Sequence, residues 1–148
     1  MPLKTDLLQT SFTLLKDQKS EFSVLFYQNL FADYPEVKPL FAHTNMEEQP
    51  KKLFASLVLV VENLKQPDTL TIKLKGLGSR HVKYGVLPKH YPMVGGSLLK
   101  SMAVILKENW TSEILEAWLE AYAVITEVML EDSDYPEEIL YPESYCCV

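Results

Sequence analysis

Apolar residues recur along most of this chain at the three- and four-residue spacing of amphipathic helices. Turn-forming and polar residues separate these segments, as in the run KDQKS at 16–20 and the pair Pro67-Asp68. No stretch offers a convincing pair of strands, so the pattern predicts an all-α fold. The predicted helices cover residues 5–15, 20–31, 35–41, 49–64, 70–84, 92 onward and 111–129.

One of these segments carries a histidine on its apolar face. Steps of 4, 3, 4 and 3 residues, which trace one face of an α-helix, separate Leu70, Leu74, Leu77, His81 and Tyr84. A buried imidazole has two nitrogens to satisfy, and an unpaired one costs about 1–3 kcal/mol. His81 is therefore either a core residue bonded to a backbone carbonyl, or a ligand whose inward nitrogen binds a metal or cofactor beside the stripe.

Residues 49–64 fit two kinds of secondary structure. The middle, SLVLVV, is β-branched enough for a buried strand. However, Leu53, Leu57, Val61 and Leu64 keep helical spacing, and both flanks continue the same face. Because no other segment could pair with a strand here, we interpret this segment as a helix.

Residues with known positional preferences mark the predicted helix ends. Ser20 and Thr111 are suited to N-caps. Pro35 and Pro92 suit first turns, and Gly85 suits the end of the helix that carries His81.

Gly95 and Gly96 lie inside a predicted helix, where each costs up to about 1 kcal/mol relative to alanine. The pair indicates either a close approach by another helix or a locally weak helix start.

Composition and charge indicate a globular protein of one domain. The 148 residues are 47% hydrophobic and 23% charged. The net charge of -6 and a single arginine argue against nucleic acid or an anionic membrane as partner. We expect no signal peptide and no membrane span, since the longest apolar run is only residues 57–61. Both cysteines lie at the C-terminal end, which excludes a core disulfide and favours a cytoplasmic location.

The composition changes after Glu131. Residues 133–148, SDYPEEILYPESYCCV, are acidic and broken by two prolines. We predict a folded domain at 1–132 and an acidic tail at 133–148 that lies outside the fold and could dock through Ile139, Leu140 and Tyr141. Cys146 and Cys147 could oxidise, bind a metal or link two chains, while an inert solvated tail is the simpler interpretation.

Three segments carry a more specific signal: LFYQNLFADYPEVKPLF at 25–41, GSRHVKYGVLPKHYPMVGGSLL at 78–99, and EAWLEAYAVITEVM at 116–129. The motif H-x-x-Y-G-V-x-x-x-H-Y-P-x-V-G, which begins at His81, is the most distinctive part. Together they resemble the bacterial single-domain globins and the haem domain of flavohaemoglobins, from roughly Ser20 to Met129. The resemblance implies a globin fold of about six or seven helices around a pocket for haem b.

The resemblance also implies residue roles. His81 would be the proximal ligand of the haem iron, while Tyr27, Gln49 and Leu53 would line the distal side. Phe41 would pack on the haem ring. The further residues expected to contact the cofactor are Leu53, Leu77, Tyr84, Val86, Tyr91 and Val94.

Two features depart from the family pattern. Pro50 directly follows Gln49, and proline disfavours helical conformation at the residue before it, which would displace Gln49 from the iron. Tyr91 matches the tyrosine that, with a glutamate, supports the proximal histidine in flavohaemoglobins, but Ser133 stands where that glutamate is expected. Loss of that hydrogen bond would lower the basicity of the proximal ligand.

The resemblance supports two functions. The first is a globin that binds O2 and NO, for oxygen binding or sensing or for NO detoxification. The alternative is an enzyme, a nitric oxide dioxygenase that receives electrons from a separate reductase, since no NAD-binding unit follows the globin segment. A hydrogen bond from Tyr27 would serve both functions, because it slows O2 release and stabilises negative charge on the ligand.

Overall fold

The computed structural model of the protein describes residues 3–131, and this part of the chain is helical without any strand. This confirms the predicted all-α class and the helical interpretation of residues 49–64. The predicted tail at 133–148 lies outside the described residues. In chain order the elements, with η for a 3-10 helix, are α1 (Thr5–Lys16), α2 (Lys19–Asp33), η1 (Pro35–Phe41), α3 (Gln49–Glu62), α4 (Pro67–Lys83), α5 (His90–Leu106), η2 (Lys107–Asn109) and α6 (Ser112–Glu131).

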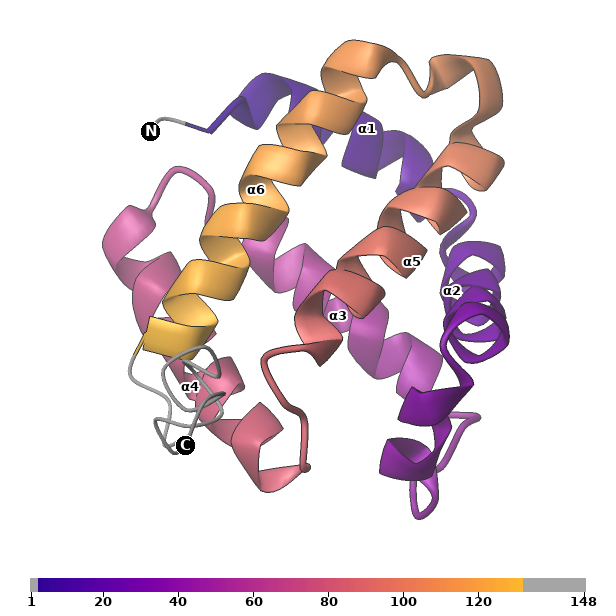
Figure 1. The fold of residues 1–148 in the computed structure, drawn as a ribbon. Coiled ribbons are helices and arrows are strands. Elements are labelled where there is room, and N and C mark those ends of the chain that lie inside the picture. The colour runs from indigo at the N-terminus through magenta and orange to yellow at the C-terminus, as the bar shows by residue number, and fades with distance from the viewer. Residues whose placement is uncertain (1–2, 132–148) are drawn as a thin grey trace, which may run out of the picture.

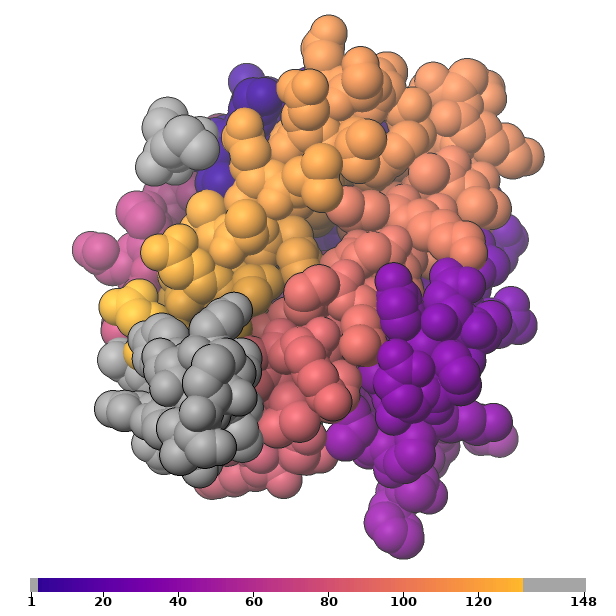
Figure 2. All heavy atoms as spheres, in the orientation of Figure 1, coloured from indigo at the N-terminus to yellow at the C-terminus, as the bar shows by residue number. Residues whose placement is uncertain are grey.

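The helices cross one another in two layers. Figure 1 shows α5 and α6 in front, with α3 crossing behind them. The main packing partners are α2 with α5 and α3, and α4 with α6. In the space-filling view, α2 and η1 adjoin α5 along one face of the molecule (Figure 2). This arrangement holds α4, which carries His81, against α6, the only described helix that packs extensively on it.

A core of aromatic and aliphatic side chains ties the N-terminal helices to α6. Phe12 of α1 stacks on Phe54 of α3, with ring centroids 5.1 Å apart. Trp118 of α6 donates a hydrogen bond from Nε1 to the buried Oγ of Ser11 at 2.9 Å, which satisfies two polar groups inside the core. These contacts join α1 to α3 and to α6, and α2 packs on α3, so the four helices form a frame for the remaining ones.

Most of the predicted helix ends are confirmed. Pro35 is the first residue of η1, the first turn of α5 contains Pro92, and Gly85 follows α4 at a φ of 85° that side chains disfavour. Thr111 caps α6, because its Oγ1 accepts a hydrogen bond from the amide of Ile114 at 3.2 Å. Ser20 was expected to cap α2, but this is wrong: the chain turns one residue earlier, α2 begins at Lys19, and no side chain caps it.

Of the glycine pair in α5, Gly95 marks a close approach and Gly96 does not. A Cβ on Gly95 would lie 2.5 Å from Cε2 of Tyr122 in α6, whereas Gly96 has only the Tyr34 hydroxyl at 3.9 Å. Gly78 of α4 lies closer still to α6, because a Cβ there would meet the backbone carbonyl of Met129. Glycines therefore set the spacing of α6 from both α4 and α5.

We expect Gly78→Ala to lower the free energy of unfolding by about 1–3 kcal/mol or more, because the obstructing atoms belong to the main chain of α6 and cannot rotate away. Gly76→Ala in the same helix is the matched control. Its nearest neighbour is the flexible Arg80 side chain at 3.8 Å, so this change should raise stability by up to about 1 kcal/mol. Urea denaturation measures both, and effects of the same sign would contradict this account of Gly78.

Candidate functional site

His81 lies in the last turn of α4 with one nitrogen already satisfied. Its Nδ1 donates a hydrogen bond to the carbonyl oxygen of Leu77 at 2.7 Å, which fixes the proton on Nδ1 and leaves the Nε2 lone pair available. Burial lowers the pKa of His81, and the positive charge of Arg80 acts in the same direction, although the bond to Leu77 opposes it. The imidazole is therefore neutral at pH 7, which is the form that binds a metal.

Two tyrosines flank the His81 ring. The ring of Tyr84 lies 5.7 Å from that of His81, and the ring of Tyr91 lies at 6.4 Å. Tyr91 is buried, but Tyr84 is 59% exposed, which departs from the apolar stripe predicted for this helix. Tyr84 is the C-cap residue of α4 and keeps helical backbone angles, with its amide bonded to the Arg80 carbonyl, so it continues the helical face at the point where the stripe reaches the surface. Its role as a cofactor contact stays a prediction.

Tyr27 and Gln49 form a polar pair at the meeting point of α2 and α3. Gln49 donates a hydrogen bond from Nε2 to the Tyr27 hydroxyl oxygen at 3.2 Å, so the hydroxyl proton of Tyr27 remains free to donate elsewhere. Burial raises the pKa of Tyr27 to about 12, partly offset by the bond from Gln49, and keeps the phenol neutral.

Pro50 does not pull Gln49 away from this pair. Gln49 is the first residue of α3 and Pro50 the second, a position where the missing N–H of proline is harmless. Gln49 is therefore helical and bonded to Tyr27. Its position relative to a haem iron stays a prediction.

Aromatic rings surround Tyr27. Phe41, at the end of η1, meets Tyr27 edge-on at 5.6 Å and Phe31 at 5.3 Å, while Phe26 lies on another side of Tyr27 at 4.7 Å. Such edge-to-face contacts fix ring positions. Tyr27 thus contacts both Gln49, which the resemblance assigns to the distal side, and Phe41, which it assigns to the haem ring.

A second set of predicted residues gathers at His81. Leu77 accepts the imidazole proton, and Val86 donates its amide to the His81 carbonyl at 3.1 Å. Among the described residues, no hydrogen bond or ring contact joins Leu53 of α3 or Val94 of α5 to either set, but both side chains pack against the core while remaining partly exposed. Their roles toward a cofactor stay predictions.

The apolar side chains expected around haem share an intermediate burial. Phe41, Leu53, Leu77, Val86 and Val94 all pack against the core and are only partly covered. A flat apolar ligand beside them would remove this remaining surface from water. Together with a neutral imidazole that has Nε2 available, these side chains fit a haem group.

Two contacts near this site were not predicted from the sequence. Tyr122 of α6 donates a hydrogen bond to the carbonyl of Tyr91 at 2.6 Å, with its ring over Gly95, which holds the start of α5 in place. His90 is buried, and its Nδ1 accepts a hydrogen bond from the amide of Leu87 at 2.9 Å. In the sequence, only Gly95 hinted at the close approach of Tyr122, and only the residues HYP of the motif hinted at a structural role for His90.

The free energy of unfolding should fall as the pH drops below about 6.5, the ordinary pKa of histidine. Burial and nearby Lys89 lower the pKa of His90, while Glu36 opposes them, so the unfolded chain binds a proton at a higher pH than the folded chain. Protonation at Nδ1 would also break the bond from Leu87. His90→Asn offers an acceptor without a titrating proton, so urea denaturation at pH 7.5 and 5.5 should show a smaller pH effect than in wild type. An unchanged pH effect would contradict the assignment.

Other parts of the described chain offer less chemistry. An open groove of about 530 Å³ lies on α2 and α5, lined mainly by Val24, Leu25, Gln28 and Ile105, away from His81 and Tyr27. Residues 3–131 contain no cluster of three or more His, Cys, Asp or Glu side chains that could hold a metal ion. None of the helices between these residues is long and apolar enough to cross a membrane.

Comparison with known proteins agrees with this geometry. The model of the globin family matches residues 24–129. A flavohaemoprotein of Pseudomonas aeruginosa is 33% identical over 141 residues, which cover 93% of this chain and 35% of that protein. A globin-like protein of Aquifex aeolicus is 32% identical over 123 residues, covering 83% of this chain and 86% of that one. The chain thus spans about a third of the flavohaemoproteins that it matches.

Solved structures agree as well. A bacterial globin from Campylobacter jejuni aligns with a TM-score of 0.73 and 30% identity, covering 86% of this chain and 91% of the other. An engineered carbene transferase and putative nitric oxide dioxygenase from Rhodothermus marinus aligns with a TM-score of 0.75 and 27% identity, covering 84% and 87%. With the helical fold and the position of His81, these findings show that the chain belongs to the globin family and is homologous to the globin domains of flavohaemoproteins.

Proposed function

We propose that this chain binds haem b through Nε2 of His81 and binds O2 or NO at the haem iron, for oxygen binding or sensing. The observation that carries the proposal is the hydrogen bond from Nδ1 to the Leu77 carbonyl, because it orients the ring and leaves the other nitrogen free. Membership of the globin family implies haem binding in general. Haem b is the specific choice because the sequence has no C-x-x-C-H motif, the pattern by which a haem is attached covalently to cysteines.

Bound haem supplies an iron atom that accepts a diatomic ligand. The residues of the chain decide how such a ligand is held. Phe41, Leu53, Leu77, Val86, Tyr91 and Val94, with Tyr84 at the edge, would enclose the ring. On the distal side, Gln49 donates a hydrogen bond to the Tyr27 hydroxyl oxygen. The neutral phenol therefore keeps its own proton and can donate it to the ligand.

The second candidate function is nitric oxide dioxygenase activity with electrons from a separate reductase. It is supported by similarity to flavohaemoproteins and to the Rhodothermus marinus protein. One observation weighs against it. The partner of His81 Nδ1 is a neutral backbone carbonyl rather than a carboxylate, and a neutral acceptor raises the basicity of the proximal ligand less. We therefore favour reversible binding of O2 or NO over enzymatic turnover of NO. We propose that this binding takes place in the cytoplasm.

Optical spectra of the ferric, ferrous and O2-exposed protein test the first function. We expect a Soret band in all three and a stable, reversible change on adding O2 to the ferrous form. Absence of haem from the purified and haem-reconstituted protein would reject it. Adding NO to the oxygenated form separates the two candidates: sustained NO consumption with a supplied flavin reductase would favour the enzyme, whereas a single turnover would favour the binding protein.

We expect a chain that ends at Asp132 to retain its Soret spectrum and haem content. The structural reason is that every residue proposed to hold haem lies between Tyr27 and Val94, and the frame that supports them ends with α6 at Glu131. Absorbance per polypeptide, compared with the full chain, measures this. If truncation removes the haem, the domain boundary proposed at 132 is wrong.

A further inference from the structure

The outer face of α4 carries positive charge in an otherwise acidic chain. This helix holds four of the 14 Lys and Arg residues of the protein but only one of its 20 Asp and Glu residues. Lys73, Arg80 and Lys83 are exposed, and at 100° per residue they fall within about 80° of one another around the helix, away from the line that Leu74 and His81 share. Among residues 3–131, no carboxylate lies within ion-pair distance of any of the three.

An apolar side chain lies on the same surface. Ile72 is 73% exposed, the largest value among the large hydrophobic residues that the structure describes. It lies eleven residues before Lys83, about three helical turns, so the two residues share one line along the helix. We call Ile72, Lys73, Arg80 and Lys83 the basic face of α4. A surface that combines separated positive charges with an exposed apolar residue suits an acidic, partly apolar segment.

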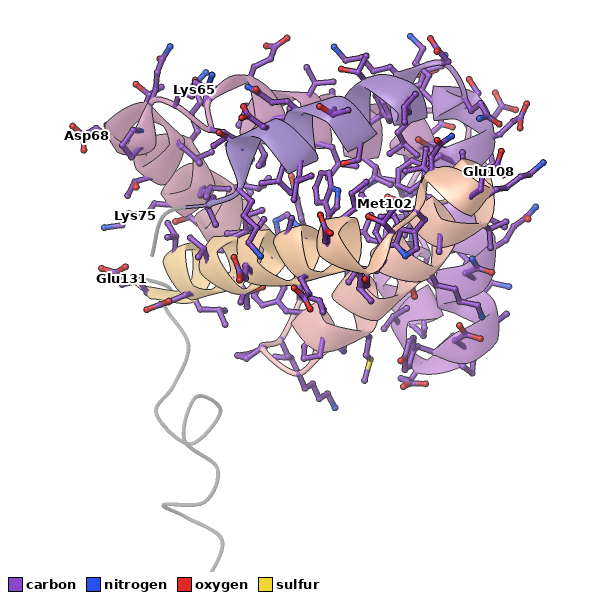
Figure 3. The ribbon with its side chains drawn as sticks, turned by 90° about the horizontal axis from the view of Figure 1, so that it is seen from above. Lys65, Asp68, Lys75, Met102, Glu108 and Glu131 are labelled. Carbon is purple, nitrogen blue, oxygen red and sulfur yellow. The ribbon has the colours of Figure 1, made fainter. Side chains whose placement is uncertain are left out.

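The chain enters its acidic C-terminal segment beside this helix. Oε1 of Glu131, the last residue of α6, lies 4.0 Å from Nζ of Lys75 on α4. Figure 3 shows the two labelled side chains at the same edge of the molecule. Residues 132–148 begin directly after this contact and contain five acidic residues and no Lys or Arg: Asp132, Asp134, Glu137, Glu138 and Glu143.

The dimensions of the two segments match. From Lys73 to Lys83, α4 rises by about 15 Å at 1.5 Å per residue. From Asp132 to Glu138, an extended chain covers about 20 Å at up to 3.3 Å per residue. The apolar residues Ile139 and Leu140 follow at once. The segment can therefore run along the basic face without any change in the described helices.

We propose that residues 132–148 dock within the same chain on the basic face of α4, with their carboxylates against Lys73, Arg80 and Lys83 and their apolar residues against Ile72. The segment covers the outer side of the helix whose inner side carries His81, and it shields this positive surface from other acidic molecules. The proposal goes beyond haem binding and does not depend on it. A docked but dispensable segment is also consistent with haem retention in the truncated chain.

The strength of this docking comes from tethering. Each exposed ion pair contributes little by itself. A segment attached next to its binding surface, however, is present there at an effective concentration in the millimolar range. Because the charges are solvent-exposed, salt weakens the interaction strongly once the screening length falls to a few ångströms.

Paramagnetic broadening in the full chain tests the proposal. Cys147→Ser leaves Cys146 as the only thiol, and a nitroxide is attached there. Amide peaks are then compared with those of the reduced label, in the ferrous carbonmonoxy form or, if the chain takes up no haem, in the haem-free form. We expect residues 72–83 to lose most of their intensity and α1 to lose little. Adding 0.5 M NaCl should restore the α4 peaks.

Charge reversal supplies the matched pair of variants. Lys73→Glu, Arg80→Glu and Lys83→Glu combined should abolish the broadening on α4, whereas Lys19→Glu, Lys38→Glu and Lys52→Glu, with the same change in net charge elsewhere on the surface, should leave it. Even broadening over the whole surface, broadening centred on another helix, or broadening insensitive to salt and to the triple reversal would overturn the proposal. Broadening of an unlabelled ¹⁵N chain mixed with a labelled ¹⁴N chain would show docking between copies and would overturn it too.

Discussion

Replacing His81 by alanine is expected to lower haem affinity by at least about 10- to 100-fold, the range reached when even an outer-sphere partner of a metal ligand is removed. The loss should be larger than for any other single side chain, because His81 is the residue with a neutral imidazole and an available Nε2 beside the apolar surface. Haem per polypeptide from the Soret absorbance, and the rate of haem transfer to an acceptor globin, measure it.

Added imidazole distinguishes loss of the ligand from loss of the fold. In His81→Ala it can occupy the vacated space and should restore haem retention, whereas a misfolded chain would not respond. His90→Ala is the matched control, because Nδ1 of His90 already accepts a hydrogen bond from the amide of Leu87 in the α4–α5 connection. If His90→Ala lost haem while His81→Ala kept it, the proximal assignment would be wrong.

The helices were predictable because their signals are local. The 49–64 segment is a clear case: its β-branched middle favours a strand, but its apolar spacing extends through both flanks, and the structure has α3 there. Thr111 and Pro35 act within one turn of their own positions, so short-range chemistry sufficed for them. The Ser20 cap failed for an equally local reason, because the turn before α2 places the helix start at Lys19.

Contacts between helices could not be predicted in the same way. The bond from Tyr122 to the Tyr91 carbonyl joins residues 31 positions apart, and neither residue type requires such a partner. The sequence did not show that α6 lies against Gly78, because a glycine in a helix can equally well face open space. Gly76 of the same helix is such a case. Tyr84 shows that the helical period predicts which face a residue shares but not how deeply it is buried: it keeps helical backbone angles at the end of α4, yet it is 59% exposed.

Tyr27→Phe is expected to speed O2 dissociation by roughly ten- to a hundredfold. A hydrogen bond to a charged group is worth about 1.5–3 kcal/mol, and 1.4 kcal/mol corresponds to a factor of ten. The phenol can make this bond because burial keeps it neutral and Gln49 donates to its oxygen rather than taking its proton. Flash photolysis and stopped-flow mixing measure the dissociation rates of O2 and of CO, which carries little negative charge.

Gln49→Leu tests whether O2 release depends on how the Tyr27 phenol is oriented, as well as on its presence. This change removes the donor to the Tyr27 oxygen but keeps the Tyr27 proton, so the effect on O2 dissociation should be smaller than in Tyr27→Phe and in the same direction. The double variant should then release O2 no faster than Tyr27→Phe alone, because the amide acts only through the hydroxyl that the first change removes. Equal changes for O2 and CO would indicate that Tyr27 acts by its size, and an additive double variant would indicate that Gln49 contacts the ligand itself.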